Sequence, residues 1–200
     1  MNKILRNRGD TQKRRAYFPA QLSTRTEGED DLFIEGYFVV FNRETELWDG
    51  CFEQIAPNAL DRSIRENDIR ALFNHNSDIV LGRNTAKTAE FTADEKGLFG
   101  RIKINKSDSQ AMDIYARVRR GDISGCSFGF YPLAESYEEK DGEYHWTVEE
   151  ADVMEVSVCT FPAYPQTEVS ARRADFDKDV NKIIQQRKAE LKKRLEEIKC

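Results

Sequence analysis

The hexapeptide Gly125-Cys126-Ser127-Phe128-Gly129-Phe130 carries the clearest structural signal in this chain. As a β-strand, it places Ser127 between two glycines on one face, and Cys126, Phe128 and Phe130 on the other. The glycines leave the Ser127 hydroxyl sterically open, while the apolar face anchors the strand in a core. An enzyme that attacks a large acyl group needs such a nucleophile on a fixed backbone. The alternative is an ordinary strand in which the glycines mark only a bulge or the close approach of another backbone.

Short strands separated by turn residues surround this hexapeptide. Alternating apolar residues and clusters of β-branched or aromatic residues predict strands over 31–41, 69–73, 79–82, 88–93, 98–104, 125–137, 144–148 and 153–161. Two helices are predicted, one opening at Pro57 and one running from a Ser107–Gln110 capping box to Gly121. This succession favours a β-rich α+β fold, a closed or nearly closed β-barrel flanked by helices.

The chain divides into three predicted parts. Residues 1–30 lack periodicity and are predicted to be a basic flexible arm, and residues 31–170 are predicted to hold the barrel domain. Residues 171–200 are predicted to form a charged, amphipathic helical tail with a partly heptad-like spacing of apolar residues. The narrow apolar stripe suits either packing on the chain's own barrel or binding to a partner helix, and the sequence leaves both open.

Charge is distributed unevenly along the chain. The net charge is −5, but residues 1–25 carry +6 and residues 174–200 carry +2, so residues 26–173 carry −13. An acidic body with a basic arm indicates an electrostatic contact made by the arm, and argues against a fold that binds nucleic acid directly. The charge alone is equally consistent with an arm that is merely solvated.

The composition excludes several classes of protein. No apolar run is long enough for a transmembrane helix, and the basic N-terminus lacks the apolar stretch of a secretory signal. The four cysteines form no C-x-x-C pair and the chain has two histidines, so no zinc site of the usual spacing is expected. Free thiols indicate a reducing compartment. Neither a metal nor a cofactor is predicted.

A nucleophilic serine needs a base within hydrogen-bond reach, and the two histidines are the candidates. His75 follows the apolar strand 69–73, at the kind of strand exit where functional side chains collect. His145 follows a predicted turn and reads as a surface residue of a hairpin. His75 is therefore the predicted base, although a structural role for an isolated histidine is the alternative.

The third member of a catalytic triad holds the imidazole and stabilises its cation. In the strand 153–161, alternation puts Glu155 and Ser157 on one face and mostly apolar residues on the other. A carboxylate in the middle of such a strand should be paired. We predict that Glu155 is the third member, and the structural alternative is that it pairs with a cation such as Arg83.

Three further residues compete with this set. Asp152 is a weaker alternative to Glu155 because it stands at the start of its strand. Cys126 neighbours Ser127 but projects from the opposite face, where a thiol behaves as a small buried hydrophobe. Ser124 falls on the Cys126 face by the same parity. None of the three is placed in the predicted site.

Seven fragments stand in a fixed order along the chain. They are Gly36-Tyr37 with Phe41-Asn42, then 52–57, Asn74-His75-Asn76, Leu81-Gly82-Arg83, Lys96-Gly97-Leu98, 124–130, and 155–158 with Pro162-Ala163. In this order the chain resembles the prohead proteases of tailed bacteriophages of the HK97 type. The resemblance covers about residues 31–170.

The resemblance implies a serine endopeptidase related in fold to the assembly proteases of herpesviruses. By position, Ser127 is then the nucleophile and His75 the general base, while Glu155 replaces a second histidine of the herpesvirus relatives. Such proteases enter the prohead from the host cytoplasm, cut the scaffolding segment from the major capsid protein and digest themselves. The implied partners are the capsid protein and its scaffolding segment. A dimer is left open, and no membrane or nucleic-acid partner is implied.

Two other functions are weighed against this one. The first is a catalytically inactive scaffold or capsid-assembly protein of the same fold, against which the complete set Ser127, His75 and Glu155 argues. The second is a zinc or thiol enzyme that uses Cys126, Cys159 and His75, against which the absence of metal-ligand spacing argues. The arm and the tail lie outside the matched region. We hypothesise that they bind scaffold or capsid protein and are trimmed on activation.

Overall fold

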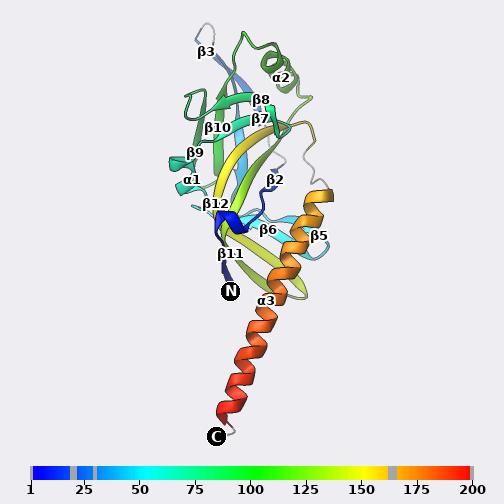
Figure 1. The fold of residues 1–200 in the computed structure, drawn as a ribbon. Helices are drawn as coiled ribbons and strands as arrows, with labels where there is room; N and C mark the ends of the chain where they lie inside the picture. Colours follow the sequence, from blue (N-terminus) through cyan, green and yellow to red (C-terminus); the bar gives the residue numbers. More distant parts are fainter. Residues whose placement is uncertain (1, 19–21, 29–30, 162–165, 199–200) are drawn as a thin grey trace. The chain divides into compact units, whose positions relative to one another are not determined.

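The computed structural model describes residues 2–18, 22–28, 31–161 and 166–198, in two compact units (Figure 1). The first unit, Met1–Tyr164, contains the β-strands and helices α1 and α2. The second unit, Pro165–Cys200, contains helix α3 (Gln166–Ile198). The helical tail therefore begins at Gln166 rather than at residue 171.

The first unit holds the predicted strands and both predicted helices, with bounds shifted by a few residues. It also holds β1, β2, β3, β5 and β6, which the sequence pattern does not predict. In chain order its elements are β1 (Asn2–Leu5), η1 (Arg8–Asp10), β2 (Arg14–Phe18), β3 (Ser23–Glu27), β4 (Asp31–Val40), β5 (Thr45–Trp48), β6 (Cys51–Ile55), α1 (Asp61–Glu66), β7 (Arg70–Phe73), β8 (Asn76–Arg83), β9 (Ala89–Ala93), β10 (Gly97–Lys103), α2 (Ser109–Arg120), β11 (Gly125–Lys140) and β12 (Glu143–Cys159).

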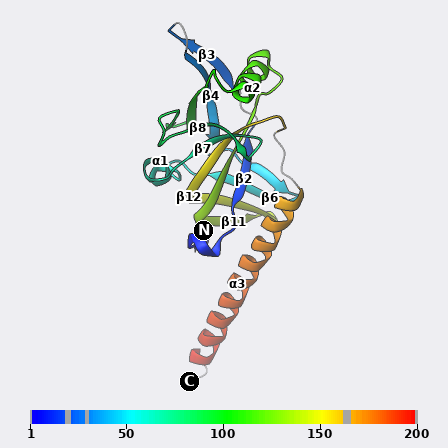
Figure 2. The same cartoon turned by 45° about the horizontal axis from the view of Figure 1, so that its top comes forward.

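Two long antiparallel strands, β11 and β12, form the centre of the larger sheet (Figures 1 and 2). The sheet has the order β1-β11-β12-β6-β5, and β2 also pairs with β11 while β7 pairs with β12 and β8. Register shifts between Gly129 and Phe130, and again between Pro132 and Glu135, mark bulges that bend the pair. Near Ser127 the local strand order is therefore β2-β11-β12-β7-β8.

A four-stranded antiparallel sheet of order β3-β4-β10-β9 packs through β4 against β11. The Cys126 Sγ atom lies 3.2 Å from the Tyr37 carbonyl oxygen of β4. Phe38, Phe128 and Phe130 are fully buried in the core between these strands. The apolar face predicted for the hexapeptide is thus confirmed as part of the core.

The predicted β-rich α+β class with a C-terminal helix is confirmed, but the barrel is not. Among the described residues, the strands form two open sheets rather than a closed one. The segments 125–137, 144–148 and 153–161 read as separate short strands, whereas they belong to β11 and β12, which are 16 and 17 residues long. Turn residues indicate how many strands a sequence contains, but they do not indicate which strands pair. The prediction of a barrel therefore had no support from strand pairing.

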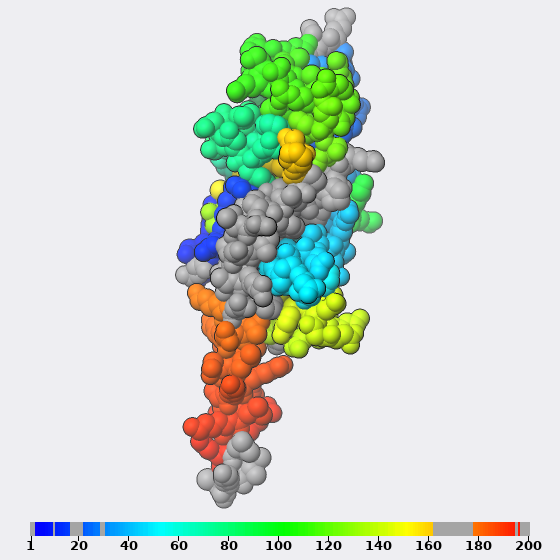
Figure 3. Space-filling model, turned by 90° about the vertical axis from the view of Figure 1, so that its right-hand side faces the viewer, coloured from blue at the N-terminus to red at the C-terminus, as the bar shows by residue number. Residues whose placement is uncertain are grey.

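The two helices of the first unit pack on different strands, α1 on β12 and β9, and α2 on β3, β4 and β8. The opposite face of α2 forms part of the surface in Figure 3, in green. Its N-cap is Asp108, whose carboxylate accepts hydrogen bonds from the backbone of Gln110 and Ala111, so the predicted capping box at Ser107 was one residue early. As predicted, Gly121 is the C-cap of the helix, with φ 88°. Its buried residues are Ala111, Ile114, Tyr115 and Val118.

The described part of residues 1–30 differs from the flexible arm that the sequence predicts. Strands β1 and β2 both pair antiparallel with β11, and β3 pairs with β4. Arg6 and Arg14 reach the fully buried Glu135, at 2.7 Å and 2.5 Å, and Lys3 lies 3.1 Å from Glu149. The electrostatic contact predicted for the arm is therefore present within the chain itself. Strands β1 and β2 were missed because pairing with the distant β11, rather than local periodicity, holds these residues.

Candidate active site

Ser127 lies in the middle of the larger sheet, on β11 between β2 and β12. It stands opposite Ser157 of β12 and residue 17 of β2. The prediction of an open hydroxyl is wrong for this structure, because the Ser127 side chain is fully buried and its Oγ donates a hydrogen bond to the Ala16 carbonyl oxygen of β2 at 2.9 Å. The cross-strand pairing places its hydroxyl on the same face as Ser157 and Glu155, as the sequence parity predicts.

Gly129 is required by the side chain that lies over it. A β-carbon at this position would stand 2.6 Å from Lys13 Cε and 3.0 Å from Glu155 Cδ. The glycine therefore makes room for the Glu155 carboxylate beside Ser127. The alternative interpretation of the strand glycines, a close approach, applies here, but the groups that approach are the side chains of Glu155 and Lys13 and not a backbone.

His75 lies in the turn between β7 and β8. Asn74 and His75 have left-handed φ angles of 49° and 59°, which non-glycine residues adopt at some cost. Hydrogen bonds across to β12 hold this turn, from the Asn74 N–H to the Val158 carbonyl at 2.9 Å and from the Thr160 N–H to the Asn74 side chain at 2.9 Å. The turn delivers the ring so that Nδ1 lies 2.7 Å from Glu155 Oε1.

Glu155 is almost completely buried, at 3% exposure, and lies among groups that stabilise its charge. Burial opposes ionisation, but the hydrogen bond and charge of His75, the Lys13 ammonium at 3.4 Å and the Ser157 hydroxyl outweigh it, and the pKa of Glu155 is lowered. The expected contact with His75 is present. Arg83, the structural alternative, instead pairs with Asp68, with its Nη2 2.5 Å from Oδ2.

Asp152, the weaker alternative to Glu155, belongs to a different cluster. Arg62 donates to its Oδ1 at 2.5 Å, and Asn67 lies 3.3 Å from the same oxygen. These contacts connect Arg62 of α1 and its C-cap residue Asn67 to β12, and they do not involve His75. Asp152 therefore has a structural partner of its own.

Ser157 belongs to the candidate site, and the sequence prediction did not include it. Its Oγ donates to Glu155 Oε2 at 2.7 Å and accepts the backbone N–H of His75 at 3.1 Å. The sequence could have indicated Ser157, because alternation along the strand places its side chain on the same face as that of Glu155. Parity could not show that the His75 turn would reach the same hydroxyl.

Two cysteines flank the site, and both are poor nucleophiles. Cys159 Sγ lies 3.9 Å from His75 Nε2, but burial, followed by the charge of Glu155, raises the pKa of Cys159 to about 12. Burial likewise raises the pKa of Cys126, on the opposite face of β11. Since the thiolate is the reactive form, neither thiol is suited to attack a peptide. No group of three side chains suited to hold a metal occurs in the part of the chain that the structure describes.

A protein-family model matches most of this chain. The model described as caudovirus prohead serine protease matches residues 20–181. The chain belongs to this family. Among curated proteins, the prohead protease of Enterobacteria phage HK97 is 30% identical over 150 residues. That match covers 74% of this chain and 63% of the length of the HK97 protein, so the chain corresponds to less than two thirds of that relative.

Among solved structures, the capsid assembly protease of bacteriophage T4 is similar in fold. The TM-score is 0.51 at 13% sequence identity, and the match covers 76% of this chain and 99% of the T4 chain. At this identity the likeness concerns the fold alone. The chain thus has the fold of a phage capsid assembly protease, and its prohead protease family is set by the sequence match.

His145 and Ser124 lie away from the site of this prohead protease family member. The Nδ1 atom of His145 is 2.7 Å from Glu44, and its ring stacks on Phe52 at 5.1 Å between centroids. Ser124 is exposed, just before β11. Both were set aside in the sequence prediction, and the structure does not bring either one to His75 or Glu155. No helix in the described ranges has the length and apolar character needed to cross a membrane.

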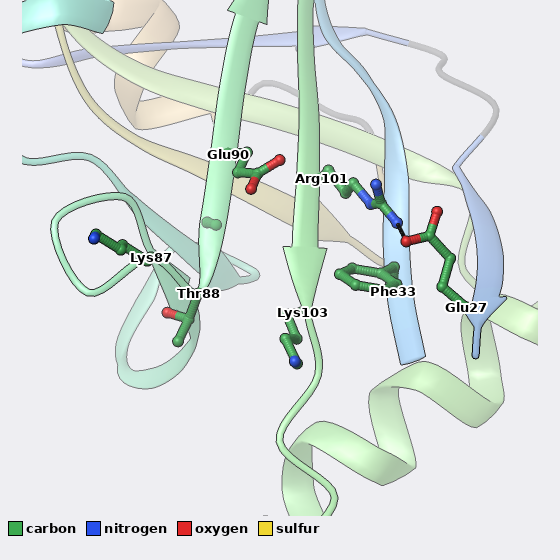
Figure 4. A pocket seen from close by; sticks show the side chains of 8 residues that line it. Glu27, Phe33, Lys87, Thr88, Glu90, Arg101 and Lys103 are labelled. Carbon is green, nitrogen blue, oxygen red and sulfur yellow. Dashed lines mark ion pairs between the residues drawn. The ribbon is translucent and has the colours of Figure 1, made fainter. Parts of the chain in front are cut away.

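A charged hollow of about 270 Å³ lies on the four-stranded sheet (Figure 4). Arg101 pairs there with Glu27 at 2.5 Å and lies 4.0 Å from the centre of the Phe33 ring, while Lys103 pairs with Asp31 at 2.8 Å. These cations are already neutralised by carboxylates of neighbouring strands. The hollow therefore offers no cluster comparable to the one formed by His75 and Glu155.

Proposed function

We propose that this protein is a serine endopeptidase of phage head maturation. The observation that carries the proposal is the contact of His75 Nδ1 with Glu155 Oε1, 2.7 Å long and buried, one strand away from Ser127. A carboxylate that orients an imidazole beside a serine hydroxyl is the arrangement used for acyl transfer. Membership in the prohead serine protease family supports the same chemistry.

In the proposed mechanism Ser127 Oγ attacks the carbonyl carbon of a peptide. His75 takes the Ser127 proton through Nε2, because Nδ1 faces Glu155, and then gives that proton to the leaving amine. The Glu155 carboxylate holds the ring and stabilises its cation. Water then attacks the acyl-enzyme, His75 takes the water proton, and Ser127 is released with a proton returned to its oxygen.

The proposed substrates are the scaffolding segment of the major capsid protein and the protease itself. The names of the relatives, a prohead protease and a capsid assembly protease, support this assignment. The proposed partner is accordingly the major capsid protein, met in the host cytoplasm during assembly and then inside the prohead. Cleavage there would remove internal protein before DNA enters.

Co-expression with the cognate major capsid protein tests this function. Mass spectrometry should show capsid protein shortened at its scaffolding segment by the wild-type protein, and full-length capsid protein with Ser127→Ala. A fluorophosphonate should label Ser127, while alkylation of thiols and the control Cys159→Ala should leave cleavage unchanged. Cleavage by Ser127→Ala would overturn the assignment of the nucleophile.

One observation favours a second candidate, a catalytically inactive assembly protein of the same fold. Ser127 is fully buried and its hydroxyl donates to a backbone carbonyl, as a purely structural serine does. The same co-expression separates the two, because an inactive protein would leave the capsid protein intact while still entering the prohead.

A further inference from the structure

Ser157 lies where the two members of the His75–Glu155 pair meet. Its hydroxyl donates to Glu155 Oε2 at 2.7 Å and accepts the His75 backbone N–H at 3.1 Å, and its side chain is fully buried. A hydroxyl has one donor and two acceptor positions, so these two contacts are compatible with each other. One side chain thus holds both the carboxylate and the turn that carries the base.

We propose that Ser157 is a positioning residue for the proposed peptidase. With Oε1 facing His75 and Oε2 held by Ser157, rotation of the Glu155 carboxylate would break one contact or both. The second contact stabilises the left-handed backbone at His75, whose φ is 59°. Ser157 therefore acts through Glu155 and His75 and does not touch the substrate. The proposal rests on the proposed function.

The test compares Ser157→Ala with the hydroxyl-retaining Ser157→Thr. We expect Ser157→Ala to lower kcat about 10-fold and to change KM less than about 2-fold, because Ser157 acts on the proposed base and its carboxylate and not on the substrate. Ser157→Thr should restore most of kcat. An unchanged kcat in Ser157→Ala would overturn the proposal, as would a Thr variant as defective as the Ala variant.

A second readout does not depend on activity. The His75 amide proton should exchange slowly in the wild type and in Ser157→Thr, and at least about 10-fold faster in Ser157→Ala, as followed by NMR. Unchanged protection in Ser157→Ala would show that the hydroxyl does not hold the turn. If the wild type cleaves nothing, the proposed function fails, and this exchange measurement still decides whether Ser157 holds the turn.

Discussion

Two histidines of this chain make nearly the same contact in very different surroundings. Nδ1 of His75 lies 2.7 Å from Glu155, and Nδ1 of His145 lies 2.7 Å from Glu44. The side chains of the first pair are 6% and 3% exposed, and those of the second are 24% and 43% exposed. Charges interact more strongly in a low dielectric, and a buried charge that loses its partner is costly. Burial, and not distance, separates the candidate catalytic pair from the surface pair.

The neighbours of the two pairs differ as well. On the neighbouring strand β11, the residue opposite Glu155 is Gly129, two positions from Ser127. The residue of β11 opposite His145 is Glu138. His145 also has a second carboxylate within 3.8 Å, that of Glu143. The first pair therefore lies beside the part of β11 that carries Ser127, and the second lies among further negative charge.

The largest contrast should appear when each histidine is removed. We expect His75→Ala to lower the rate of peptide cleavage about 10⁴-fold, because the proposed base is lost, and His145→Ala to change the rate less than about 2-fold. The rates are compared on one fluorogenic capsid-derived peptide, with melting curves to confirm folding. Similar losses of cleavage rate in the two variants would show that burial does not distinguish the candidate catalytic histidine from the surface histidine.

The same principle extends to stability. Arg14→Met leaves the fully buried Glu135 with one fewer cation, and should lower the free energy of unfolding by about 3–5 kcal/mol. Lys103→Met breaks the exposed pair with Asp31 and should cost less than about 1 kcal/mol. Urea unfolding measures both. An Arg14→Met variant as stable as Lys103→Met would contradict the role given to burial.

The carboxylates of the two pairs provide a sharper comparison. Glu155→Gln keeps the shape of the side chain but removes the charge that stabilises the imidazolium, and we expect kcat to fall about 10²–10³-fold. The matched Glu44→Gln should leave kcat within about 2-fold of the wild type. An unaffected Glu155→Gln enzyme would show that the ring needs no orienting charge.

The smallest expected effect concerns pH and stability. The folded-state pKa of Glu155 lies below its ordinary value of 4.5, so its stabilising contribution is complete above the unfolded pKa and is lost as pH falls through the folded one. Between pH 6 and pH 3 the wild type should therefore lose more unfolding free energy than Glu155→Gln. Denaturant titrations at several pH values measure this, and parallel losses in the two proteins would contradict it.

The sequence predicted the parts of the site that depend on local alternation. The parity of residues 125–130 and 153–161 put Ser127 and Glu155 on the correct faces, and the strand before His75 placed the histidine at a strand exit. Alternation alone could not show that β11 and β12 pair with Ser127 opposite Ser157, nor that the turn after β7 brings His75 to Glu155. The family resemblance supplied that link.

What the sequence did not predict depends on long-range pairing. Residues 14–18 show no strand pattern of their own because β11, more than 100 positions away, defines their conformation. The role of Ser157 required knowledge of where the His75 turn lies. The barrel was wrongly expected because the number of strands does not determine the order in which they pair.

Gly129 links two positions that lie far apart in the chain. Since the carboxylate of Glu155 fills the space that any β-carbon at 129 would need, alanine there and glutamate at 155 exclude each other unless the carboxylate moves. A substitution at one position therefore requires a change at the other. An alanine at position 129 would need an acid shorter than glutamate at position 155. Gly129→Ala by itself should therefore lower the rate of peptide cleavage by the proposed peptidase, and combining it with Glu155→Asp should recover part of that rate.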